Sequence, residues 1–129
     1  MVTKKGDGKR TQKVADQVRA ELMSLLLTGD VHDPSLEQLA VSGVLMTDDL
    51  RLAKVYVRSL DMEPSAETQK RVLRGLERAK GFLRREIAHR LNLRYAPELR
   101  FHWDESIDRG RQVEALLQEI KSSEREPTD

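Results

Sequence analysis

The period of the apolar residues changes repeatedly along this chain, and the order of these periods limits the folds that the chain can adopt. Across residues 11–26 the apolar residues recur every three or four positions, which predicts an amphipathic helix. Two alternating runs, 39–46 and 53–58, then predict strands joined by a hairpin connection. The first run shifts phase at Ser42-Gly43, where a β-bulge would keep both halves on one face.

Helical periodicity returns after Ser65, which we expect to cap the next helix. The apolar residues of this segment form two stripes, one ending near Leu76 and one beginning at Leu83. We expect a kink or a break between the stripes near residues 79–81, where a glycine supplies the freedom that a kink needs.

A third alternating run, 99–104, and helical spacing after Asp108 complete the order α-β-β-α-kink-α-β-α. A three-stranded sheet with helices packed on one face is a two-layer α+β fold. We expect one domain over residues 10–121, a flexible basic arm at 1–9 and a disordered tail at 122–129.

The composition excludes several classes of protein. The chain has no cysteine, which rules out disulfides, thiolate metal sites and cysteine nucleophiles. It has neither a signal-peptide pattern nor an apolar run long enough to span a membrane, so we expect a cytoplasmic protein. The phosphate-binding loop, the dinucleotide fingerprint and the serine-hydrolase motif are all missing. We expect no cofactor, no metal and no small-molecule substrate.

The net charge is only +1, but the charges are strongly segregated. Residues 1–13 sum to +4, 14–69 to −6, 70–100 to +7 and 104–129 to −4. The block 70–100 holds ten Lys and Arg residues against three acids, so pairing within the block leaves most of its cations free. Eight of the ten are arginines, whose planar guanidinium suits phosphate, and the block therefore favours a nucleic-acid partner.

The candidate RNA-binding residues are cations of the arm, the first helix and the basic block, together with the small residues at the expected kink, where an RNA backbone has room to approach. They are Lys4, Lys5, Lys9, Arg10, Lys13, Arg71, Arg74, Arg78, Ala79, Lys80, Gly81, Arg84, Arg85 and Arg90. A solvated, salt-bridged helix face is the alternative for the cations. A simple packing kink is an equal alternative for the small residues.

Two further groups have weaker support. Tyr56 lies between two cations on the outer face of its strand and has the position to stack on a base, although cross-strand packing is the favoured explanation. An alternative hypothesis is a metal-dependent enzyme site formed by His102, Asp104 and Glu105. An exposed strand edge explains these residues better.

Five motifs, in order and at natural spacing, resemble the ribosome-binding factor A family over residues 10–117. They are Arg10-x-x-Lys13-Val14, Leu39-Ala-Val-Ser-x-Val-x-Met-Thr-x-Asp-Leu50, Ala53-Lys-Val-Tyr-Val57, Ala79-Lys80-Gly81-Phe82-Leu83-Arg84 and Pro97-Glu98-Leu99-x-Phe101-x-x-Asp104-x-Ser106. Gly43 and Leu45 depart from the usual pattern of the family's first strand.

The resemblance implies a type II KH-like fold, in which an Ala-x-Gly junction between helices replaces the RNA-clamping GxxG loop of ordinary KH domains. It also implies a non-enzymatic factor that binds the immature small (30S) ribosomal subunit through 16S rRNA. Such a factor assists late maturation, including that of the 5′ end of 16S rRNA, and is linked to growth in the cold. We expect a monomer. A KH-like protein–protein adaptor and a generic basic RNA-binding module remain the alternatives.

Overall fold

The computed structural model of the chain describes residues 2–28, 31–60, 65–106, 114 and 116–121, with side chains from residue 9 onward. Two long helices and a three-stranded sheet follow one another in the predicted order, and a short 3-10 helix precedes the first strand. The elements are α1 (Val2–Leu27), η1 (Pro34–Leu36), β1 (Leu39–Met46), β2 (Leu52–Ser59), α2 (Ala66–Arg90) and β3 (Glu98–Trp103).

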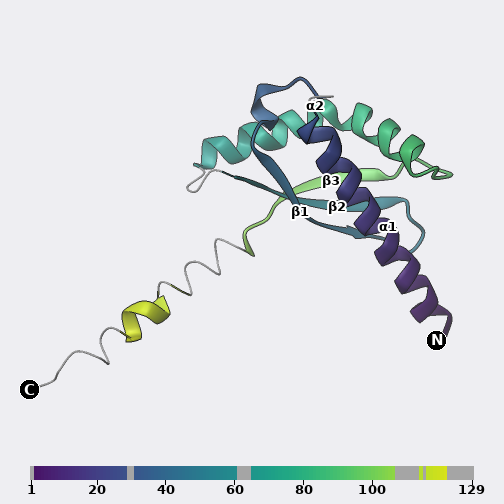
Figure 1. The fold of residues 1–129 in the computed structure, drawn as a ribbon, viewed down its shortest axis with the longest axis horizontal. Helices are drawn as coiled ribbons and strands as arrows, with labels where there is room; N and C mark the ends of the chain where they lie inside the picture. The colour runs from purple at the N-terminus through teal and green to yellow at the C-terminus, as the bar shows by residue number, and fades with distance from the viewer. Residues whose placement is uncertain (1, 29–30, 61–64, 107–113, 115, 122–129) are drawn as a thin grey trace, which may run out of the picture.

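The sheet has the order β1-β2-β3, with β1 antiparallel and β3 parallel to β2. Parallel neighbours need a crossover connection, and α2 provides it between β2 and β3. The register of β1 shifts between Val41 and Gly43, which confirms the predicted bulge. Both helices lie on one face of the sheet, so the predicted α+β class and its two layers are confirmed (Figure 1).

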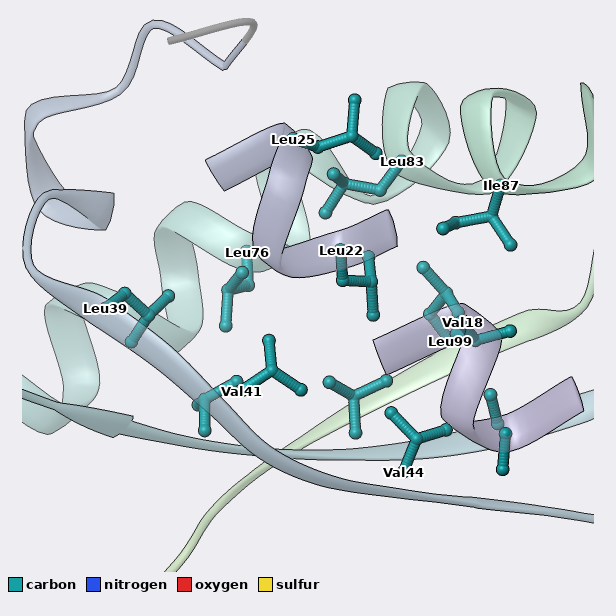
Figure 2. Packing of buried hydrophobic residues seen from close by; sticks show 14 of the residues in the cluster. Val18, Leu22, Leu25, Leu39, Val41, Val44, Leu76, Leu83, Ile87 and Leu99 are labelled. Carbon is teal, nitrogen blue, oxygen red and sulfur yellow. The ribbon is translucent and has the colours of Figure 1, made fainter. Parts of the chain in front are cut away.

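The core lies between the helices and the inner face of the sheet. Figure 2 shows side chains from both helices and from the strands pointing into this space. All of them are aliphatic, as the scarcity of aromatic residues requires. The labelled residues are Val18, Leu22, Leu25, Leu39, Val41, Val44, Leu76, Leu83, Ile87 and Leu99.

The second helix is one unbroken element of 25 residues, capped by the Ser65 side chain, which accepts a hydrogen bond from the Thr68 N–H. Of the kink or break expected near residues 79–81, the break is therefore wrong. Leu83 follows Leu76 by seven positions, which is about two turns, so an unbroken helix keeps both apolar stripes on one face. Figure 1 shows the axis of α2 bending near its middle without separating into two helices.

The first helix begins at Val2, earlier than the start near Thr11 that the apolar pattern indicates. Once a helix has nucleated, each added residue gains a hydrogen bond, and no proline interrupts this segment. The flexibility of the basic arm at 1–9 stays a prediction, as does the division into arm, domain and tail.

The predicted C-terminal helix is described only in part. Residues 116–121 are helical, and their apolar side chains Leu116, Leu117 and Ile120 are exposed. The expected cap Asp108 and the tail 122–129 lie outside the described residues. None of the helices in the described ranges is long and apolar enough to cross a membrane.

Candidate nucleic-acid interface

The first turns of α2 gather cations on an exposed surface. Lys70, Arg71 and Arg74 line a shallow hollow together with Glu67. The guanidinium of Arg71 reaches the Thr68 hydroxyl at 3.5 Å. Lys70 and Arg74 make no hydrogen bond or ion pair with any residue in the described ranges. Their charges are consequently available to an anionic partner. We call Lys70, Arg71 and Arg74 the α2 basic cluster.

Arg78 extends this surface by one turn, but its charge is partly engaged. Its Nη2 lies 2.9 Å from Oδ2 of Asp33, which stands just before η1, and 3.4 Å from the Ser35 hydroxyl. The pKa of Asp33 lies below its ordinary value, mainly because the Ser35 hydroxyl and backbone N–H donate to the carboxylate, and then because Arg78 does. Arg78 remains 60% exposed in its side chain, so this pair competes weakly with phosphate.

The small residues predicted at a kink lie on the same helix. Ala79 is half-buried, while Gly81 is exposed and a Cβ there would meet only Nη1 of Arg85, at 3.5 Å. Lys80 pairs with Glu77 at 2.9 Å. Packing within the chain therefore does not require a glycine at position 81, and the bare backbone there faces solvent.

Two arginines of the predicted set are occupied in holding the fold. Arg84 donates to the carbonyl oxygens of Pro97 at 3.0 Å and Ala96 at 3.2 Å, and so fixes the chain that leads into β3. Arg90 pairs with Glu21 of α1 at 3.2 Å and with Glu86 at 3.5 Å. Counting only the acids inside the basic block missed these partners, because the carbonyl groups of Ala96 and Pro97 are not acids and Glu21 lies on α1, outside the block.

The remaining predicted cations are exposed. Arg85 makes no ion pair with a described residue. On α1, Lys9, Arg10 and Lys13 are all exposed, whereas the side chains of Lys4 and Lys5 lie outside the described part of the chain.

The structure also brings together a cation–aromatic group that the sequence did not indicate. Arg10 lines a hollow with Arg94 and Tyr95. The guanidinium carbons of Arg51 and Arg94 lie 5.0 and 5.4 Å from the Tyr95 ring centroid, within cation–π range. The sequence neighbours Arg94 and Tyr95 could have suggested this group. Arg51 could not be predicted, because only the pairing of β2 with β3 brings it close to Tyr95.

The residues of the enzyme alternative have other contacts. The His102 ring stacks on Tyr56, with centroids 5.5 Å apart. The Asp104 carboxylate accepts hydrogen bonds from the Ser42 and Ser106 hydroxyls. Among the described residues no group of three or more metal-ligating side chains is placed to hold a metal ion.

The fold and this surface together define a class of protein: a small α+β domain whose helices cover one sheet face and present exposed arginine and lysine side chains. Comparison with known proteins specifies the class further. The family model described as "Ribosome-binding factor A" matches residues 10–117. The chain therefore belongs to the ribosome-binding factor A family.

Curated relatives and a solved structure agree with this assignment. The ribosome-binding factor A of Chromohalobacter salexigens is 41% identical over 117 residues, covering 91% of this chain and 88% of its own. That of Sorangium cellulosum is 44% identical over 113 residues, covering 88% and 90%. The crystal structure of ribosome-binding factor A from Thermus thermophilus aligns with a TM-score of 0.59 and 27% identity, covering 71% of this chain and 93% of that one.

Proposed function

We propose that this protein is a non-catalytic assembly factor that binds the immature small (30S) ribosomal subunit through its 16S rRNA. In this role it assists late maturation of the subunit, including processing of the 5′ end of 16S rRNA. It acts as a monomer in the cytoplasm, and its loss is felt most during growth in the cold.

The α2 basic cluster is the observation that carries the proposal. Lys70, Arg71 and Arg74 line one exposed hollow, and two of the three have no partner among the described residues. Clustered cations of this kind neutralise phosphates and release counterions, which makes binding strong at low salt and weak at high salt. Membership of a family named for ribosome binding supports ribosomal RNA as the partner of this surface.

The exposed segments beside the cluster add to the same surface. Arg78 and Arg85 continue it along α2, and the bare backbone at Gly81 gives an RNA strand room to come close. The segment of α1 that carries Lys9, Arg10 and Lys13 lies away from the cluster, where Arg10 shares a hollow with Arg94, and supplies further phosphate contacts there.

Sedimentation with purified free 30S subunits across a salt series tests the proposal, with assembled ribosomes and an unrelated RNA as comparisons. We expect selective co-sedimentation with free 30S subunits that weakens steeply as salt rises. Equal binding to every RNA would reduce the protein to a generic basic RNA binder. Absence of binding to all of them would leave the protein–protein adaptor.

The maturation role has its own test in cells that lack the protein. We expect 16S rRNA with an unprocessed 5′ end to accumulate, most strongly in the cold, and to disappear when the wild-type chain is supplied. Normal 5′ ends at every temperature would contradict the role in processing while leaving subunit binding intact.

A further inference from the structure

The face of the sheet opposite the helices carries its own group of aromatic and cationic side chains. The register of β2 and β3 pairs Lys54 with Arg100 and Tyr56 with His102. Aligned residues on parallel strands point to the same face, and the alternate residues of both strands, such as Val55 and Leu99, are buried on the inner side. Both helices lie on that inner side, and none of the helices that the structure describes packs on the outer face (Figure 1).

An ordered pair of rings stands at the centre of this outer face. The rings of Tyr56 and His102 stack with centroids 5.5 Å apart and an angle of 30° between their planes. Tyr56 is half-buried and His102 is exposed, so the pair is held in place while part of it meets solvent. Rings that are already ordered lose less side-chain entropy when a ligand stacks on them.

The β1 side of the pair is open because of the bulge. Gly43 lies opposite Tyr56 in the register of β1 and β2, and a Cβ at Gly43 would meet nothing within 4 Å. The hydroxyl of the bulged residue, Ser42, lies 3.2 Å from the carbonyl oxygen of Tyr56 and donates to the Asp104 carboxylate. The glycine therefore leaves free space beside the tyrosine.

Cations surround the rings, and the nearest acids are already engaged. Lys54 and Arg58 stand two residues before and after Tyr56, and Arg100 stands two residues before His102. Glu98 lies 3.6 Å from Arg100. Lys54 makes no ion pair with any residue that the structure describes. The face thus carries three cations and two acids, Glu98 beside Arg100 and Asp104 near Arg58, around an aromatic centre.

We propose that the outer face of the sheet binds single-stranded RNA. An unpaired base stacks on the Tyr56–His102 pair, in the space that Gly43 leaves, while Lys54, Arg58 and Arg100 contact the flanking phosphates. Bases stack on protein aromatic rings with little regard to sequence, and a cationic groove tracks the backbone on either side. The proposal rests on the proposed function only for the choice of RNA over DNA.

Titration of the full ¹⁵N-labelled chain with two oligomers tests this proposal. One is an unstructured RNA of eight nucleotides, and the other is an abasic ribose–phosphate oligomer of equal length and charge. We expect the base-bearing oligomer to shift the amide signals of 54–58 and 100–102, and the abasic oligomer to shift them much less. By fluorescence anisotropy, Tyr56→Ala lowers the affinity for the base-bearing oligomer about tenfold, whereas Tyr56→Phe retains it.

The control is His32→Ala, which removes an exposed ring from the segment ahead of η1 and outside this face. It leaves the affinity unchanged, and thermal melting of each variant checks that it is folded. Equal affinity for the two oligomers, or unchanged binding by Tyr56→Ala, would overturn the proposal. If 30S sedimentation still depended on Arg74 in that case, the proposed function would stand without a stacking surface.

Discussion

Asp104, directly after β3, holds its charge through hydrogen bonds rather than through an ion pair. Its pKa lies below the ordinary value of 3.8, first because the Ser106 hydroxyl donates to the carboxylate and then because the Ser42 hydroxyl does. A pKa that is lower in the folded than in the unfolded chain stabilises the fold above the unfolded value. This stabilisation is lost as the pH falls through the folded-state pKa.

Asp104→Asn should therefore lower the free energy of unfolding at neutral pH. In acid, the free energies of unfolding of the variant and of the wild type should become similar. Urea unfolding at a series of pH values from neutral to below 3.8 measures that difference. Glu119→Gln, a change at an exposed position, serves as the control and leaves the pH profile unaltered. A wild-type advantage over Asp104→Asn that stays constant across the series would contradict the assignment.

Burial separates two leucines of equal size. Leu83 is 0% exposed between α2 and the sheet, whereas Leu45 is 58% exposed on the outer face of β1. Leu83→Ala leaves a cavity and should cost about 2–5 kcal/mol of stability. Leu45→Ala should change stability by no more than about 0.5 kcal/mol. Chemical unfolding of both variants checks this contrast, and similar losses would mean that Leu83 is not part of the core.

At the level of the element, α2 contains two glycines with opposite surroundings. A Cβ at Gly75 would overlap the Ser35 hydroxyl and lie 3.1 Å from Cδ2 of Leu36, so η1 fits against this helix only because no side chain intervenes. At Gly81 the added Cβ makes one ordinary contact, with Arg85. Position 75 therefore needs glycine for packing, and position 81 does not.

Alanine substitutions turn this contrast into a measurement. Gly81→Ala should raise the free energy of unfolding by up to about 1 kcal/mol, because alanine favours a helix interior. Gly75→Ala should lower it, since η1 must move away. Thermal melting of the two variants should show shifts of opposite sign. A loss of stability in Gly81→Ala would show that the bend of α2 depends on this glycine.

The elements that the sequence predicted well are those in which the pattern of apolar residues is local. Each predicted strand agrees with the observed one within about a residue, and the bulge follows from a phase shift between Val41 and Val44. The break in α2 was predicted wrongly, because a step of seven residues from Leu76 to Leu83 was treated as a change of face. The first residues of α1, 2–10, lack periodic apolar residues, so the apolar pattern did not predict that the helix begins at Val2.

The candidate site was less predictable, because the partners of its cations come from distant segments. Arg78 meets Asp33, 45 positions away, and Arg90 meets Glu21, 69 positions away. The sequence identified which residues are cationic. Only the tertiary structure separates the cations with available charge from those already paired.

For the whole molecule, the cations proposed to contact RNA lie on two opposite faces of the fold. The α2 basic cluster lies on the helical layer, while Lys54, Arg58 and Arg100 lie on the outer face of the sheet. Because the sheet stands between them, a single short duplex does not reach both. An RNA that contacts both faces must pass around the edge of the domain, which a branched rRNA junction with unpaired segments is able to do.

This division leads to a prediction that distinguishes RNA contact from structural support on one helix. Arg74 is exposed and unpaired among the described residues, whereas Arg84 is held by the carbonyl oxygens of Pro97 and Ala96. Arg74→Ala should weaken binding to free 30S subunits and reduce the slope of log affinity against log salt by about 0.7–0.9, the loss of one phosphate contact. Its melting temperature should stay near that of the wild type.

Arg84→Ala should do the reverse, lowering the melting temperature because two carbonyl groups lose their donor, while the salt slope of the folded protein is preserved. Lys121→Ala, which removes an exposed cation from the acidic C-terminal segment, is the matched control for the loss of one charge. Binding measured at several salt concentrations, beside a melting curve for each variant, separates the two effects. If Arg84→Ala reduced the salt slope as Arg74→Ala does, while melting like the wild type, Arg84 would be a phosphate contact and the structural role assigned to it would be wrong.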